Sequence, residues 1–245
     1  PGAMQYDRHI QYQTYDVTDF LQKGENGIGI TLSSGWWCDA QTFAVRNYNY
    51  FGDRESVLAR LEITYSDGSI DAVVTDTDSW DYYGEGPYRY AGIFYGEELD
   101  GRLYDIYSDF SKPGFGIDGM KKSVEIEVCE IEESFTIRPG FGRPWPKVAH
   151  SKVQLTGGIN APVRKVCVLS AKSVSEPRKG LYIYDLGQEM AGVPCIRFRG
   201  KAGETATVRY GEMLYPELAE YGSLHGLILT DNYRDAESID KYILR

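Results

Sequence analysis

The chain has 245 residues and a net charge of −10, from 36 Asp and Glu against 26 Lys and Arg. This length suits one large domain or two smaller ones with real cores. The chain is acidic, and its longest basic run is Lys121-Lys122. Nucleic acid and anionic membranes are therefore excluded as favoured partners. No apolar stretch approaches the roughly 20 residues of a membrane span. We therefore expect a soluble protein, and cytoplasmic, periplasmic and secreted locations all stay open.

The composition favours strands over helices. The chain holds 20 Tyr, 9 Phe, 4 Trp and 27 Gly, which is typical of short strands joined by tight turns. No window shows a 3.6-residue period over 12 residues, and Pro216–Tyr221 is the best candidate for a single helical turn. The sequence predicts an all-β fold of two antiparallel, jelly-roll-like β-sandwich domains, residues 1–118 and 119–245.

The first elements of the chain are a short turn and a strand. Pro1-Gly2-Ala3 before Met4 is typical of an expression remnant and not of a native start. Thr18 or Asp19 can cap one helical turn, and Gly24 can end it. The apolar run Ile28–Leu32 then predicts a strand.

A hairpin follows in the first half of the chain. Val57–Tyr65 predicts a strand, and residues 66–69 carry an Asp-Gly turn that leads into a second strand at Ile70–Val74. Asp81–Tyr95, dense in Gly and Tyr, is predicted to be a loop.

The second half predicts a series of short strands. Ser123–Ile137 alternates as a half-exposed strand does, and Pro139–Pro146 predicts a linker, because its three prolines cannot donate to a strand ladder. The later strands are expected at Val163–Leu169, Leu181–Tyr184, Cys195–Arg199, Thr205–Tyr210 and Lys241–Leu244.

The four cysteines predict no redox or metal chemistry. They are far apart and lack any C-x-x-C pair, and three of them lie in strand-like runs. We expect buried free thiols, in preference to disulfides or a zinc site, at Cys38, Cys129, Cys167 and Cys195.

The acids and histidines predict no catalytic residue in this chain. A glycosidase needs two carboxyl groups roughly 5–10 Å apart on opposite sides of the scissile bond. Glu97 and Glu98 are neighbours on a strand, so they point to opposite faces and cannot converge. The histidines lie in no recognisable motif and the sequence has no G-x-S-x-G, which disfavours triad chemistry.

Sugar binding is the more plausible chemistry. A pyranose offers its apolar C–H face to an aromatic ring and its hydroxyls to carboxylates, so clustered Trp and Tyr with Asp and Glu form the expected signature. No cofactor is expected; the acidic loops leave calcium as a weaker alternative, without any recognised ligand spacing. The candidate carbohydrate-binding residues are Trp37, Asp39, Tyr83, Tyr88, Tyr95, Glu97 and Asp100.

Several motifs, in order along the chain, carry a family resemblance. HIQYQTYDVTDFLQKGENGIGITLSSGWW, residues 9–37, is similar to the pattern R-V-Q-Y-Q-T-Y-D-V-T-D-L-L-x-x-G-E-N-x-x-G-x-x-L-x-x-G-W-Y of bacterial α-L-rhamnosidases of glycoside hydrolase family 78. DLGQEM at 185–190 and RYGE at 209–212 resemble later landmarks of the same family. The chain departs from the pattern at Glu189, where Asn is usual, and at Val193, where Trp is common.

The resemblance implies a non-catalytic portion of a glycosidase. It corresponds to an N-terminal domain, truncated at its start, and a concanavalin-like domain, while the family's catalytic helical barrel and its D-x-x-x-R-D-E-R stretch have no match here. The implied parent reaction is hydrolysis of terminal α-L-rhamnose with inversion, and the implied partners are a rhamnose-containing glycan and that barrel. The alternatives are a free-standing carbohydrate-binding module and a structural module that pairs through its sheet edges.

Overall fold

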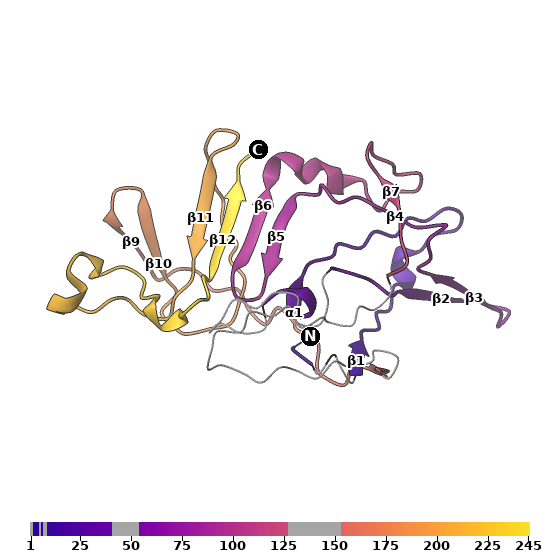
Figure 1. Ribbon diagram of the computed structural model, residues 1–245, viewed down its shortest axis with the longest axis horizontal. Coiled ribbons are helices and arrows are strands. Elements are labelled where there is room, and N and C mark those ends of the chain that lie inside the picture. The colour runs from indigo at the N-terminus through magenta and orange to yellow at the C-terminus, as the bar shows by residue number, and fades with distance from the viewer. Residues whose placement is uncertain (1, 5, 7–8, 41–53, 127–152) are drawn as a thin grey trace.

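The computed structural model describes residues 2–4, 6, 9–40, 54–126 and 153–245 (Figure 1). Strands outnumber helices in these ranges, and the helical pieces are short, which confirms the all-β class. The strands are β1 His9–Tyr12, β2 Arg60–Thr64, β3 Ile70–Val74, β4 Asp81–Tyr82, β5 Tyr88–Gly92, β6 Gly96–Asp100, β7 Lys121–Lys122, β8 Gln154–Gly157, β9 Ser173–Arg178, β10 Leu181–Asp185, β11 Thr205–Arg209 and β12 Ile239–Ile243. The helical pieces are α1 Gly35–Cys38 and the 3₁₀ turns η1 Thr18–Phe20, η2 Gly101–Ser108, η4 Ala219–Leu224 and η5 Asp231–Tyr233.

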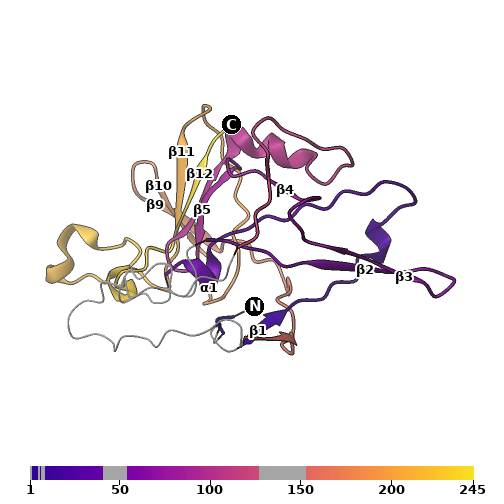
Figure 2. The ribbon, with the colours of Figure 1, turned by 45° about the vertical axis from the view of Figure 1, so that its right-hand side comes forward.

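The centre of the molecule is a four-stranded mixed sheet in the order β11-β12-β6-β5. β12 pairs antiparallel with β11 and parallel with β6, so the last strand of the chain lies between strands from both halves of the sequence. Figure 1 and Figure 2 show the yellow and orange strands directly beside the magenta pair. This sheet contains strands from both sides of the predicted boundary at residues 118 and 119, and the boundary stays a prediction.

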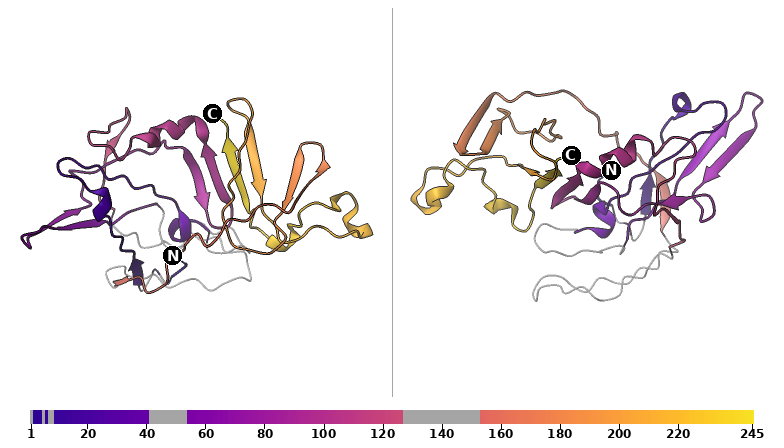
Figure 3. Two further views of the ribbon diagram at one scale, coloured as in Figure 1. Left: turned by 180° about the vertical axis from the view of Figure 1, so that it is seen from behind. Right: turned by 90° about the horizontal axis from the view of Figure 1, so that it is seen from above.

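The hairpin of β2 and β3 forms as the sequence predicts. Gly68 has a φ of +84°, which an Asp-Gly turn requires, and the Asp67 carboxylate accepts the Ser69 backbone N–H at 2.9 Å. Tyr65 and Ser69 close the turn by a backbone hydrogen bond of 2.9 Å. The hairpin and the ribbon of β9 and β10 lie at opposite ends of the molecule (Figure 3).

The predicted turn and three further predicted strands also form. η1 occupies the expected turn, but the predicted caps are wrong: its N-cap is Val17, without a side-chain cap, and it ends at Phe20 with Leu21 as the C-cap, before Gly24. β10, β11 and β12 lie within one or two residues of their predicted ranges. The remaining pairs are the parallel β1–β8 and the antiparallel β4–β7, both of which join distant parts of the chain.

Some predicted strands are wrong. Ile28–Leu32, Val163–Leu169 and Cys195–Arg199 contain no strand, because no described strand pairs with them, and an apolar alternation alone supplies no ladder. In the second of these segments Val163 is 95% exposed. The predicted loop Asp81–Tyr95 is also wrong, because this range contains the strands β4 and β5. Its tyrosines suit strands, and β6 supplies the pairing partner of β5. Ser123–Ile137 and Pro139–Pro146 lie largely or wholly outside the described residues.

The buried residues gather mainly around the four-stranded sheet and α1. Trp36 of α1 meets Phe94 edge to face, with ring centroids 5.6 Å apart, and this contact joins the helix to the turn between β5 and β6. The buried side chains in the described ranges are Cys38, Asp39, Ala40, Pro87, Tyr95, Leu99, Asp100, Ile183 and Tyr215. No helix in those ranges is both long enough and apolar enough to cross a bilayer.

The cysteine prediction holds only in part. Cys38, Cys167 and Cys195 are free thiols, as predicted, and Cys38 is buried. Cys167 and Cys195 are exposed, because the strands that were expected to bury them do not form. Burial raises the pKa of the Cys38 thiol. Cys129 lies outside the described residues.

Candidate functional site

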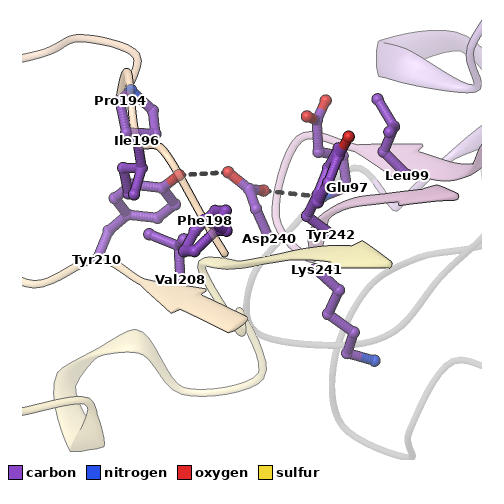
Figure 4. Close-up of a pocket in the computed structure, with 10 residues that line it drawn as sticks. All are labelled: Glu97, Leu99, Pro194, Ile196, Phe198, Val208, Tyr210, Asp240, Lys241 and Tyr242. Atoms are coloured by element: carbon purple, nitrogen blue, oxygen red, sulfur yellow. Dashed lines mark hydrogen bonds between the residues drawn. The ribbon is translucent and has the colours of Figure 1, made fainter. Parts of the chain in front are cut away.

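A pocket of about 160 Å³ lies on one face of the four-stranded sheet (Figure 4). We call it the sheet pocket. β6 and β12 form its floor, β11 forms one side, and Pro194, Ile196 and Phe198 contribute to its wall. Its charged and polar side chains belong to Glu97, Tyr210, Asp240, Lys241 and Tyr242, and the rest of the wall is apolar.

Strand alternation and register place these residues together. Glu97 and Leu99 are two apart on β6, so they share a face, and Tyr242 is paired with Leu99 across the parallel ladder. Asp240 is two residues from Tyr242 on β12 and pairs with Val208 on β11. One face of the sheet therefore carries acidic and aromatic side chains from segments that are far apart in the sequence.

Asp240 is held on both sides. Its Oδ1 accepts the backbone N–H of Glu97 at 2.9 Å, and its Oδ2 accepts the hydroxyl of Tyr210. Figure 4 shows the Asp240 carboxylate between these two partners. Burial, and then the hydrogen bond to Asp240, raise the pKa of Tyr210, so its hydroxyl stays protonated and continues to donate. Both carboxylate oxygens of Asp240 are thus occupied in holding strands together.

Glu97 has a carboxylate without such partners. No residue in the described ranges donates a hydrogen bond to its side chain or forms an ion pair with it. Burial raises the pKa of Glu97, and the nearby charge of Asp240 raises it further. The sheet pocket therefore holds one carboxylate that is engaged and one whose acceptor oxygens face no described donor.

An aromatic pair forms the apolar part of the sheet pocket. The rings of Phe198 and Tyr242 are stacked, with centroids 6.3 Å apart and an interplanar angle of 20°. Leu99 lies in the floor and is buried. This wall can cover the apolar face of a ligand, while the Glu97 carboxylate can accept a hydrogen bond from it.

A second hollow lies by Glu98, on the other face of β6, and shares Glu97 and Lys241 with the sheet pocket. It measures about 190 Å³, and Tyr90, Tyr95 and Glu98 are among the residues that line it. Lys241 approaches Glu98 with Nζ and Oε2 3.6 Å apart, so this face neutralises part of its own charge. Glu97 and Glu98, neighbours in the sequence, therefore lie in different electrostatic surroundings.

Three of the seven predicted sugar-binding residues lie beneath the surface. Asp39 is 1% exposed and accepts the Tyr90 hydroxyl at 2.8 Å, and Tyr95 is 7% exposed. Asp100 is 6% exposed, and Arg102 donates to its two oxygens through Nε at 2.9 Å and a terminal nitrogen at 2.7 Å. These hydrogen bonds lower the pKa of Asp100.

The other four predicted residues reach the surface at separate places. Trp37 meets Tyr6 edge to face at 5.9 Å, and Tyr83 is half-buried near Gly119. Tyr88 packs on Tyr107, with ring centroids 6.1 Å apart. Only Glu97 of the seven lines the sheet pocket. Sugar binding by the seven residues stays a prediction, and the structure does not gather them into one surface.

Four residues that surround Glu97 were not predicted from the sequence. They come from the second half of the chain, and the hydrogen bond between Glu97 and Asp240 spans 143 positions. The alternation of IDKYI at 239–243 was a usable signal, because it places the acid and the tyrosine on one face and the isoleucines and lysine on the other. The missed residues are Phe198, Tyr210, Asp240 and Tyr242.

The described ranges hold no group of three or more His, Cys, Asp or Glu side chains that could bind a metal ion. Calcium binding stays a prediction. The sheet pocket also lacks the arrangement that glycoside hydrolysis needs, because Asp240 would have to give up its strand contacts before it could activate water or protonate a leaving group.

Two family profiles match the chain. Residues 1–138 match the α-L-rhamnosidase N-terminal domain, and residues 175–245 match the bacterial α-L-rhamnosidase concanavalin-like domain. β5 and β6 come from the first match and β11 and β12 from the second, so the four-stranded sheet contains strands of both.

Curated relatives and solved structures agree with these matches. An α-L-rhamnosidase of Streptomyces avermitilis is 30% identical over 245 residues, covering 100% of this chain and 20% of the enzyme. One from Formosa agariphila is also 30% identical, over 99% of this chain and 23% of the enzyme. The crystal structure of the Streptomyces avermitilis enzyme complexed with L-rhamnose aligns with a TM-score of 0.73 at 27% identity, over 100% of this chain and 20% of that one. The native Aspergillus terreus enzyme aligns with a TM-score of 0.74 at 25% identity, over 100% of this chain and 24% of that one. The chain thus spans about a fifth of the length of the curated relatives it matches.

Proposed function

The chain belongs to the bacterial α-L-rhamnosidase family, and from that premise we propose that it is a non-catalytic β portion of an enzyme that hydrolyses terminal α-L-rhamnose. Its role is to support and orient the catalytic domain. The acid and the base of an inverting hydrolysis would then come from residues outside these 245.

One observation carries this proposal. The four-stranded sheet joins the segment that matches the N-terminal domain to the segment that matches the concanavalin-like domain, and Asp240 fastens the joint by hydrogen bonds to both neighbouring strands. A shared sheet holds its strands in fixed register, so the two segments move as one body. Such a body is suited to placing a neighbouring domain.

The share of the relatives' length supports the same role. The chain covers about a fifth of enzymes whose names state the activity, which leaves most of their length for other parts. The two carboxylates in the sheet pocket do not supply the missing chemistry, since Asp240 is bound at both oxygens.

The test is an activity assay on the 245-residue chain with p-nitrophenyl α-L-rhamnoside. We expect no release of p-nitrophenol, while the Streptomyces avermitilis enzyme under the same conditions provides the positive control. The non-catalytic assignment would be contradicted if the chain hydrolysed the substrate, kept that activity after a second purification, and lost it in the Glu97→Gln variant.

A second candidate is a structural module that pairs through its sheet edges. The ribbon of β9 and β10 favours it, because this two-stranded sheet has unpaired outer edges within the described structure and exposes Val174, Tyr182 and Tyr184. Light scattering over a range of concentrations distinguishes the candidates. A concentration-independent monomer argues against edge pairing, and a dimer that dissociates on dilution supports it.

A further inference from the structure

Asn26 closes a short loop near the start of the chain. Its Nδ2 donates to the backbone oxygens of Gln22 at 2.8 Å and Gly24 at 3.0 Å, and its Oδ1 accepts the Gln22 backbone N–H at 2.9 Å. Gly24 has a φ of +102°, a backbone conformation that suits glycine and lets the chain turn back within the loop. We call these three hydrogen bonds the carboxamide lock, because one side chain amide holds the two ends of the loop together.

The residue that follows the carboxamide lock is a glycine. Asn26-Gly27 is the one Asn-Gly pair in the sequence. Glycine has no Cβ, so its backbone nitrogen can approach the preceding side chain more closely than the nitrogen of another residue. Within the described ranges, no backbone oxygen accepts the Gly27 N–H. A nitrogen that can act as a nucleophile therefore lies next to a carboxamide that it can attack.

The carboxamide lock opposes this attack while it is closed. All three of its hydrogen bonds tie the Asn26 side chain to residues that precede it, Gln22 and Gly24, whereas the attacking nitrogen belongs to the residue after it. The Asn26 side chain has to leave these partners before Gly27 can reach its Cγ. The rate of attack therefore depends on how often the loop opens.

We propose that Asn26-Gly27 is a site of spontaneous deamidation and that the carboxamide lock controls its rate. When the loop opens, the Gly27 nitrogen loses its proton to solvent base and attacks Asn26 Cγ. A bond forms between that nitrogen and Cγ, the bond between Cγ and Nδ2 breaks, and Nδ2 takes up a proton and leaves as ammonia. Water then opens the succinimide ring at either carbonyl, which leaves aspartate or isoaspartate at position 26.

The modified loop cannot close in the same way. A carboxylate only accepts hydrogen bonds, so it cannot donate to the backbone oxygens of Gln22 and Gly24. Isoaspartate also adds a methylene group to the main chain directly before Gly27, which lies so close to Ser111 that a Cβ on it would clash with the Ser111 backbone. Deamidation thus converts a reversible opening of the loop into a permanent one.

The experiment ages the full 245-residue chain in mildly alkaline buffer and follows Asn26 by peptide mass mapping. Deamidation replaces an amide by an acid and changes the mass, whereas isomerisation at an Asp-Gly pair such as Asp67-Gly68 leaves the mass unchanged. We expect the folded chain to react about tenfold more slowly than the same chain in urea, which corresponds to about 1.4 kcal/mol of protection by the carboxamide lock.

Gly24→Ala should open the carboxamide lock without touching the reacting atoms. A Cβ on Gly24 would meet no atom within 4 Å, so alanine brings only the cost of a left-handed backbone, and the rate in the folded chain should rise about tenfold. Gly180→Ala is the matched control, because Gly180 has a φ of +80° and open space as well, but lies in the turn between β9 and β10. It should leave the rate unchanged, and in urea all three chains should react alike.

Asn26→Asp tests the consequence for the loop. Hydrogen exchange of the Gln22 amide, followed by NMR, should be about tenfold faster in this variant than in the native chain, and the same spectra report whether each variant is folded. Control by the carboxamide lock is overturned by equal rates in the folded and urea-unfolded native chain, or by equal rates in Gly24→Ala and Gly180→Ala. The site itself is overturned if the chain in urea shows no mass increase at Asn26, and permanent opening is overturned if Asn26→Asp keeps the native exchange rate at Gln22.

Discussion

Asp240 accepts the backbone N–H of Glu97 across two neighbouring parallel strands, and so joins residues that are 143 positions apart. The same carboxylate accepts the Tyr210 hydroxyl from the end of β11. One side chain on the central strand β12 therefore fixes both of its neighbours. The stability of the four-stranded sheet should depend on this acid more than on any surface ion pair of the chain.

Tyr210→Phe should destabilise the chain. The change removes only the hydroxyl that donates to Asp240, and a hydrogen bond to a charged group contributes about 1.5–3 kcal/mol. Urea unfolding followed by circular dichroism measures the loss. Tyr182→Phe is the matched control, since Tyr182 is 56% exposed and its hydroxyl has no described partner. Equal midpoints for the two variants would show that the buried hydroxyl contributes nothing.

Glu97→Gln should stabilise the chain at neutral pH. The pKa of Glu97 is raised above its ordinary value of 4.5 by burial and by Asp240, so the folded state binds the proton more tightly than the unfolded state does. The stability of the native chain therefore falls as the pH rises from 4.5 through the raised pKa of Glu97. Thermal melts from pH 4 to pH 8 should show the gap between the two proteins opening over that window. A variant less stable than the native chain at pH 7 would contradict this sign.

Gly96→Ala should loosen the junction of β6 and β12. Gly96 has a φ of +82°, and a Cβ there would clash with the backbone oxygen of Ile239. The left-handed backbone alone costs about 1–2 kcal/mol for a residue with a side chain, and the clash adds to that. The midpoint of urea unfolding should fall accordingly. The control is Gly84→Ala, because Gly84 has no positive φ and open space around it; a similar loss in both variants would remove the close approach as the cause.

Arg102→Gln should make the chain less stable and less sensitive to acid. Arg102 holds the pKa of the buried Asp100 below its ordinary value of 3.8. The ion pair therefore stabilises the fold above pH 3.8, and this contribution is lost as the pH falls through the lowered pKa of Asp100. Acid titration of tyrosine fluorescence should show a shallower decline in the variant. Arg60→Gln, which removes an exposed ion pair with Glu62, should leave the acid profile unchanged. A native-like acid profile in Arg102→Gln would contradict the assigned role.

Local chemistry made part of this fold predictable. The hairpin of β2 and β3 follows from an Asp-Gly turn between two apolar runs, whereas η1 forms at the predicted place without the predicted caps. Long-range pairing was not predictable in the same way. Cys195–Arg199 alternates as well as Thr205–Tyr210 does, yet only the second segment has a strand beside it, and alternation does not say where a partner is.

The candidate site was likewise predictable only in part. Glu97 was recognisable as an acid among tyrosines, but its surroundings depend on the parallel register of β12 against β6, which no nearby residue encodes. Asp39 and Asp100 also have the composition of ligand-binding acids, and burial with Tyr90 and Arg102 gives them structural roles instead. Composition identified the residue types, while strand order decided which of them reach a common surface.

The position of β12 constrains how this chain can be made in a cell. Among the described strands, β6 has β5 as its sole partner until Ile239–Ile243 have been synthesised, since its other neighbour, β12, lies far downstream in the sequence. Translation proceeds at about 5–20 residues per second, so a nascent chain waits several seconds with that edge of β6 open. Ribosome-bound intermediates should therefore recruit chaperones at β6, and a stop codon only a few residues before Ile239 should prevent the central sheet from closing at all.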